Sequence, residues 1–192
     1  MLGRNAPYEE KVFSLFEEHT EWIAKGKAGL PQDLGLRVCI VESSTGFIVH
    51  YRVMQHETDD AVAVRMIKET HARYPYVRSC SFDKGFHSPE NQQKLSELLD
   101  LCVFPRKGKL NEEQKAMEGA EGFMEKRRKH SAVESAVNAI ENHGLDRCCD
   151  QGIAGFKRYV ALAVVARNLQ LIGDILRQQE LEKREKERKK AA

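Results

Sequence analysis

Asp83 is the residue whose position most clearly suggests chemistry. It follows an apolar stretch, Tyr76–Phe82, that is typical of a short strand, and a predicted helix begins soon after it. Ligands and metal ions gather at the carboxyl ends of strands in open α/β sheets. We expect Gly85 to let the backbone turn sharply and Phe86 to anchor this loop in the core. The plainer interpretation, an Asp that only forms a turn, stays open.

Glu134 is the second carboxylate of interest. It lies beside a helically spaced apolar stripe formed by Val133, Val137 and Ile140. A carboxylate at the edge of a buried face is costly unless it has a partner, and a divalent cation is one such partner. Taken alone, Glu134 also fits a half-exposed helix residue. An Asp at a strand end and a Glu on a later helix are together compatible with a two-metal phosphoryl-transfer site.

Basic residues flank both carboxylates in the sequence. The net charge is only +2, so any nucleic-acid binding must come from local patches. Contacts to phosphate supply most of the sequence-independent affinity for DNA. The DNA-contact candidates are Lys84, Arg106, Lys107, Arg127, Arg128 and Arg147. The alternative is a set of solubilising surface charges.

The elements that would position these residues alternate between strand and helix. Leu36–Glu42 and Gly46–Met54 predict a β-hairpin, because both are rich in β-branched residues and turn-forming residues join them. Lys11–Phe16 predicts a further strand, whereas the Gly, Pro and Asp content of Lys25–Gly35 predicts a loop. Asp59–Arg73 starts with two acidic residues and then spaces its apolar residues as a helix does.

The second half of the chain becomes increasingly helical. Ser88 and Pro89 predict the start of a helix, and Leu101–Pro105 predicts a short strand. Two long helical patterns follow, from Asn111 to Asn142 and from about Ile153 into the charged tail Glu180–Lys190. This order predicts an α/β domain with a mixed sheet, antiparallel first and parallel afterwards. The tail is expected to be a solvated helix with internal ion pairs, and a weak phosphate-binding arm is the alternative.

Composition excludes several broad classes of protein. A chain of 192 residues with 41% hydrophobic and 31% charged residues fits one soluble globular domain and not a disordered chain. We expect no membrane helix and no signal peptide. Five scattered cysteines suit buried thiols in the cytoplasm. GxSxG, P-loop and GxGxxG motifs are absent from the sequence, which argues against the enzyme classes that carry them.

Several segments together resemble the catalytic domain of bacterial insertion-sequence DDE transposases. The matching segments are His19–Ala28, Gly46–Met54, Phe82–Asn91, Val103–Lys109, His130–Asp150 and Gly155–Asn168. The resemblance implies a ribonuclease H-like domain over residues 1–178, followed by a charged tail over residues 179–192. It implies DNA as the partner, both the terminal inverted repeats of a mobile element and the target. It also implies association with a second copy or with a full-length transposase.

The resemblance gives the two carboxylates specific roles. Asp83 looks like the second acidic metal ligand of the family, and Glu134 looks like the third. Such enzymes use two Mg²⁺ (or Mn²⁺) ions for strand cleavage and transfer during transposition. An unrelated α/β module remains an alternative, and it would place Asp83 and Glu134 far apart.

The chain departs from the family pattern at three places. His130 stands where relatives often carry a basic residue, and Glu141 stands where a Lys is common. The first catalytic Asp normally lies ahead of the segment at which this chain begins, so we expect an N-terminally truncated fragment. Glu17 and Glu18 are the acidic residues that could replace it. We expect this chain alone to bind Mg²⁺ weakly and to leave DNA uncut, and an inactive fragment that binds DNA or a transposase is the alternative function.

Overall fold

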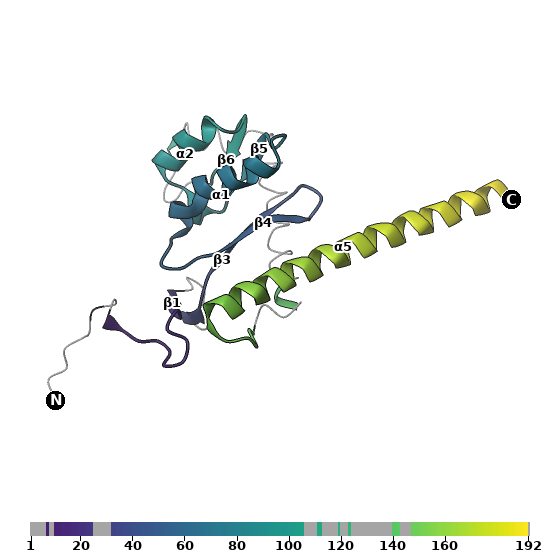
Figure 1. Cartoon of the computed structure of the whole chain (residues 1–192). Helices are drawn as coiled ribbons and strands as arrows, with labels where there is room; N and C mark the ends of the chain where they lie inside the picture. Colours follow the sequence, from purple (N-terminus) through teal and green to yellow (C-terminus); the bar gives the residue numbers. More distant parts are fainter. Residues whose placement is uncertain are drawn as a thin grey trace.

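The structure is a computed structural model, and it describes residues 7, 10–24, 32–105, 111–112, 119, 123, 140–142 and 147–191. Figure 1 shows a body of short strands and helices from which one long helix extends. Its elements, in chain order, are β1 (Glu21–Ala24), β2 (Gln32–Gly35), β3 (Val38–Glu42), β4 (Ile48–Val53), α1 (Asp59–Arg73), β5 (Ser79–Ser81), the 3₁₀ turn η2 (Lys84–Phe86), α2 (Pro89–Ser96), β6 (Leu101–Val103) and α5 (Gly152–Ala191). The predicted α/β class is confirmed.

The predicted hairpin is present as the antiparallel pair β3–β4. Its turn is closed by Ser43, whose amide donates to the carbonyl of Phe47 at 2.8 Å and whose carbonyl accepts from Gly46 at 2.9 Å. Gly46 has a φ of +86°, a conformation that glycine adopts without steric cost. The turn chemistry read from the sequence therefore produces the turn that is observed.

Helix α1 lies between two hydrophobic clusters, and its limits are those predicted from the sequence. Ala63 and Ile67 pack on the cluster that contains Leu95. Val62 and Met66 pack on the cluster that contains Cys39 of β3. Because residues three and four apart share a helix face, one helix joins the hairpin to the β5–β6 pair.

The strands β5 and β6 are parallel, with Ser81 opposite Val103 in the register. The amide of Phe82 donates to the carbonyl of Val103 at 2.9 Å, so the pairing continues one residue beyond β5. The Phe82 and Phe104 rings stack at 4.2 Å between centroids. Helix α2 covers this pair and begins where predicted, with Ser88 Oγ accepting from the Asn91 amide at 3.1 Å.

Helix α5 is docked on the hairpin through its first half and then leaves the body of the protein (Figure 1). Ala163 and Val164 pack with Ile48 of β4 and with Ile140. From residue 172 to residue 190 every position is exposed. The predicted solvated tail is confirmed as a helix, with an ion pair of 3.0 Å between Arg184 and Glu180. The helix passes through residues 178–179 without a break, and the proposed domain limit there stays a prediction.

Three predictions about the strands are wrong. Residues 11–16 are not a strand: Val12, Leu15 and Phe16 are exposed, and no strand lies beside this segment in the described part of the chain. The predicted loop Lys25–Gly35 ends in strand β2, which pairs with β1. The described strands also form three separate two-stranded sheets instead of one mixed sheet.

Two further predictions concern α5 and the segment before it. Most of the helical pattern from Asn111 to Asn142 lies outside the described residues. Among the described helices, α5 is the one long and apolar enough to cross a bilayer, contrary to the expectation from the sequence. Length and composition alone are weak evidence for a membrane span.

Candidate functional site

Asp83 lies at the carboxyl end of the parallel pair, as the sequence predicted. The pairing that β5 makes with β6 ends at Phe82, and Asp83 is the next residue. The side chains of Asp83 and Lys84 are both exposed. The fold therefore presents a carboxylate and an ammonium group to solvent at a strand end, where ligand sites of α/β proteins are found.

The turn after Asp83 holds its carboxylate in one orientation. Asp83 Oδ1 accepts a hydrogen bond from the Lys84 amide at 2.7 Å and caps η2. The Asp83 carbonyl accepts from the Phe86 amide at 3.1 Å. Phe86 packs against both clusters that flank α1, which confirms its predicted role as the anchor of this loop. Asp83 thus combines the role of turn former with an exposed position.

Gly85 is required for a reason that differs from the prediction. Its φ is not positive, so the turn does not depend on a left-handed backbone. A Cβ at Gly85 would instead lie 2.6 Å from Oδ2 of Asp59, well inside the contact distance of two atoms. The absence of a side chain therefore lets η2 sit against the start of α1.

A charged cluster beside this contact was missed by the sequence analysis. Arg37 lies 3.6 Å from Asp59 and also donates to the carbonyl of Glu57. Arg52 binds both carboxylate oxygens of Glu57, at 2.9 and 2.7 Å. The hydrogen bond from Arg52 holds the pKa of the Glu57 carboxyl below its ordinary value. These pairs join the hairpin to the start of α1, and no spacing in the sequence marks them.

The remaining predicted site residues fall into two groups. Glu134, Arg106, Lys107, Arg127 and Arg128 lie outside the described residues. Arg147 is described and exposed, but it lies in the segment that leads into α5. In Figure 1 the start of α5 lies beside β1, at the other end of the molecule from β5 and β6. The structure therefore does not bring Arg147 next to Asp83.

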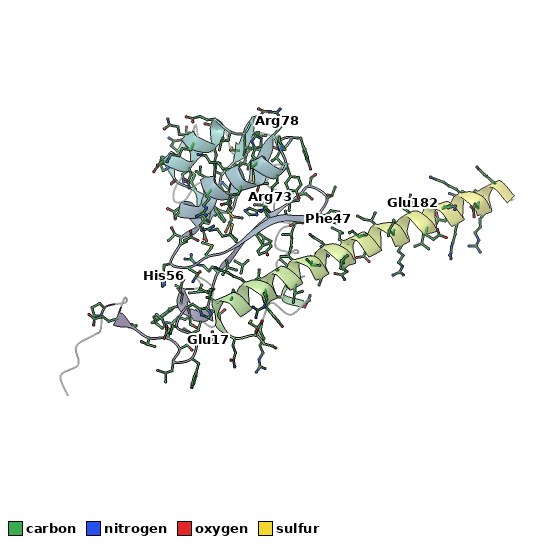
Figure 2. The ribbon with its side chains drawn as sticks, viewed as in Figure 1. Glu17, Phe47, His56, Arg73, Arg78 and Glu182 are labelled. Atoms are coloured by element: carbon green, nitrogen blue, oxygen red, sulfur yellow. The ribbon has the colours of Figure 1, made fainter. Side chains whose placement is uncertain are left out.

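Glu17, a candidate replacement for the first acidic ligand, has a structural partner. Both of its carboxylate oxygens accept from the Gly152 amide at the start of α5, at 3.2 and 3.1 Å. A negative charge is favourable at a helix N-terminus. Figure 2 places Glu17 beside the start of α5 and away from the β5–β6 pair. Glu18 is the next residue along the chain, and nothing in the described structure brings it closer to Asp83 than Glu17 is.

A hollow in the described part of the chain also lies away from Asp83. It has a volume of about 450 Å³ and is bordered by β1, β2, β3 and the start of α5. Its acidic lining residues are Glu17, Asp33, Glu141 and Asp150. An excess of carboxylates makes this hollow a poor site for DNA phosphate. Within the described residues no group of three or more His, Cys, Asp and Glu side chains is arranged to hold a metal ion.

Comparison with known protein families finds a match over most of the chain. The family described as "Transposase DDE domain" matches residues 11–169, more than four-fifths of the chain. The matched range contains Asp83 and Glu134 as well as all the described strands. No curated protein and no solved structure matches the chain.

The match confirms the resemblance seen in the sequence. A transposase role in general, with DNA as the molecule acted on, follows from it, and the family generally uses divalent metal ions. By this match over most of its length, the chain belongs to the family of transposase DDE domains.

Proposed function

We propose that this chain is the ribonuclease H-like catalytic domain of an insertion-sequence transposase, which cuts and joins DNA phosphodiester bonds. The observation that supports this most is the exposed carboxylate of Asp83 at the carboxyl end of a parallel strand pair, inside the family match. The order of elements, with a hairpin before α1 and a parallel pair around α2, is compatible with such a fold. The proposed place of action is the bacterial cytoplasm.

Asp83 and Glu134 are proposed as metal ligands. Mg²⁺ prefers carboxylate oxygens, keeps several of its waters and binds to one or two carboxylates plus substrate phosphate. Asp83 fits this preference as a ligand through one oxygen, because it is exposed and its other interaction, with the Lys84 amide, fixes its direction. When bound, the two metal ions would activate the attacking hydroxyl and stabilise the leaving oxygen.

The chain's own residues would hold DNA at this edge. Lys84 follows Asp83 directly and is exposed. The register of β5 and β6 places Pro105 level with Asp83, and Arg106 is bonded to Pro105. Because phosphate contacts position DNA without reading its sequence, Lys84 and Arg106 are proposed to orient the backbone toward Asp83. Lys107, Arg127 and Arg128 are proposed as further phosphate contacts of the same kind.

A strand-cleavage assay on element-end DNA with Mg²⁺ or Mn²⁺ tests the proposal. The sequence predicts that this chain alone leaves DNA uncut. Any cleavage that it does show should fall by about 100-fold or more with Asp83→Asn or with Glu134→Gln, the order of loss seen when a charge-stabilising group is removed. Asp100→Asn is the matched control, because Asp100 is an exposed Asp immediately before β6, at the opposite end of the same strand pair. Cleavage that survives both site substitutions would overturn the assignment of Asp83 and Glu134.

A DNA-binding measurement separates the basic residues. Lys84→Ala together with Arg106→Ala should weaken DNA binding and reduce its dependence on salt. With fewer phosphate contacts, binding releases fewer counterions from the DNA. Arg147→Ala should have a smaller effect, because Arg147 lies near the start of α5. Equal effects of the two changes would contradict the placement of DNA at the β5–β6 edge.

The second candidate function is a domain that binds DNA or a full-length transposase without cutting. The observation that favours it is the hydrogen bond from the Lys84 amide to Asp83, which gives this carboxylate a structural role that needs no metal ion. The same assays distinguish the two functions. DNA binding without cleavage, unchanged by Asp83→Asn, would support the non-catalytic function and refute the enzymatic one.

A further inference from the structure

Asn91 is a buried polar residue of α2, close in sequence to the turn that carries Asp83. It is only 7% exposed, although Asn residues mostly lie at protein surfaces. Its side-chain nitrogen has two hydrogens to donate. Asn91 Nδ2 donates to the carbonyl of Asp60 at 2.7 Å and to the carbonyl of Phe86 at 3.0 Å. Because both partners are oxygens that only accept, the nitrogen of this side chain must face them, and both of its hydrogens are used.

The two carbonyls belong to different elements of the fold. Asp60 lies in the first turn of α1, 31 residues before Asn91, and Phe86 is the last residue of η2. The backbone N–H of Asn91 is also fixed, since it donates to Ser88 Oγ at 3.1 Å. The Asn91 side chain therefore extends from a capped helix start and links η2 to α1.

The turn transmits this link to Asp83. The Phe86 amide donates to the Asp83 carbonyl at 3.1 Å, and the Lys84 amide donates to Asp83 Oδ1 at 2.7 Å. The first hydrogen bond fixes the backbone of Asp83, and the second fixes its carboxylate. In addition, Gly85 lies so close to Asp59 that it has no room for a side chain. The turn is thus held by α1 and α2 as well as by its own hydrogen bonds.

We infer that Asn91 is a positioning residue, which fixes Asp83 in the direction needed to bind a metal ion. The inference rests on the proposed function, in which Asp83 is a metal ligand. Groups that orient a ligand without touching the metal ion typically contribute about 10- to 100-fold to metal affinity. Mg²⁺ demands nearly octahedral geometry, so a carboxylate that binds it through one oxygen is sensitive to direction.

A role in stability alone makes a different prediction for metal binding. Removing the Asn91 side chain also destabilises the fold, because it leaves buried carbonyls without a donor. If stability were its only role, any change that destabilises the fold equally would affect metal binding equally. Leu98, just after α2, allows this comparison. It is half-buried and packs on the cluster that contains Leu95, and its apolar side chain forms no hydrogen bond to the turn.

NMR spectroscopy of the full, isotope-labelled chain with Mn²⁺ in place of Mg²⁺ tests the inference. Paramagnetic Mn²⁺ broadens the signals of nearby amides even when it binds weakly, so broadening at Lys84 and Gly85 reports an ion at Asp83. Asn91→Ala should raise the Mn²⁺ concentration needed for this broadening by about tenfold or more. Asn91→Leu, which is similar in size but has no donor, should raise it as much. Leu98→Ala is the matched control and should leave it close to that of the unsubstituted chain.

Urea denaturation of the same variants gives their free energies of unfolding for comparison. Loss of Mn²⁺ affinity in both Asn91 variants, without such a loss in Leu98→Ala, supports the positioning role. Unchanged affinity in the Asn91 variants, or an equal loss in Leu98→Ala, overturns that role and leaves the proposed function standing. Broadening that persists in Asp83→Asn, or that is absent from the unsubstituted chain, refutes Asp83 as a metal ligand and the inference with it.

Discussion

Replacing Asn168 with alanine removes both hydrogen bonds between its side chain and the backbone of the β3–β4 hairpin. Asn168 Oδ1 accepts from the Ile48 amide at 3.0 Å, and Asn168 Nδ2 donates to the Ile48 carbonyl at 2.9 Å. Ile48 is only 4% exposed. The side-chain amide of Asn168 thus takes the place of a neighbouring strand at the edge of β4.

The cost follows from the groups left without partners. Each buried backbone donor or acceptor that loses its partner costs about 1–3 kcal/mol. Since two such groups are involved and water can reach part of the vacated space, Asn168→Ala should lower the free energy of unfolding by about 2–4 kcal/mol. Asn168→Leu keeps most of the volume but neither hydrogen bond, so its cost should be similar.

Urea denaturation followed by far-UV circular dichroism measures this cost. Gln179→Ala, at an exposed position of the same helix, serves as the control and should change stability by less than about 0.5 kcal/mol. Hydrogen exchange of the hairpin should quicken at Ile48 in both Asn168 variants. The reasoning fails if Asn168→Leu is as stable as the unsubstituted chain, because packing alone would then explain the contact.

Two further predictions concern the surroundings of Asp83 and the thiols. Gly85→Ala should lower the free energy of unfolding by about 1 kcal/mol, because its Cβ would lie 2.6 Å from Asp59 Oδ2. Asp59→Ala should relieve most of that cost in the double variant. If urea denaturation shows that the costs of the two changes are simply additive, the contact is contradicted. Burial raises the pKa of the Cys39 thiol to about 12, so at pH 8 iodoacetamide should modify exposed Cys149 well before Cys39. Peptide mass spectrometry reports both sites, and equal rates without denaturant would refute the burial of Cys39.

The elements that could be predicted from the sequence are those fixed by neighbouring residues. Helix α2 begins at Pro89 because the residue before it, Ser88, accepts a hydrogen bond from the Asn91 amide, and this cap can be predicted from the sequence. The hairpin is equally local, since its turn is closed by Ser43 and Gly46. Strand β2 is different, because Gln32–Gly35 is polar and exposed, and only its pairing with β1 makes it a strand. Pairing between separated segments leaves no mark in the composition of either one.

The candidate site shows the same division between local and distant causes. The position of Asp83 at a strand end could be predicted, since it depends on one apolar stretch and the turn after it. The pairing of Arg37 with Asp59 could not, because it depends on how the hairpin meets α1. Gly85 lies between these cases. Its importance was predicted, but the reason is a contact with Asp59 and not the backbone angle.

The basic residues show why a charge pattern in a sequence cannot by itself define a surface. The sequence groups Lys84 with Arg147 because both belong to the basic residues that flank the two candidate carboxylates. Parallel pairing places the end of β5 level with the end of β6, so Lys84 shares an edge with Pro105 and the residue bonded to it. Arg147 precedes α5, which starts beside β1. Lys84 and Arg147 can therefore contact one DNA duplex only if the duplex runs across the hairpin. DNA affinity measured with each residue changed alone decides between one extended DNA-binding surface and two separate ones.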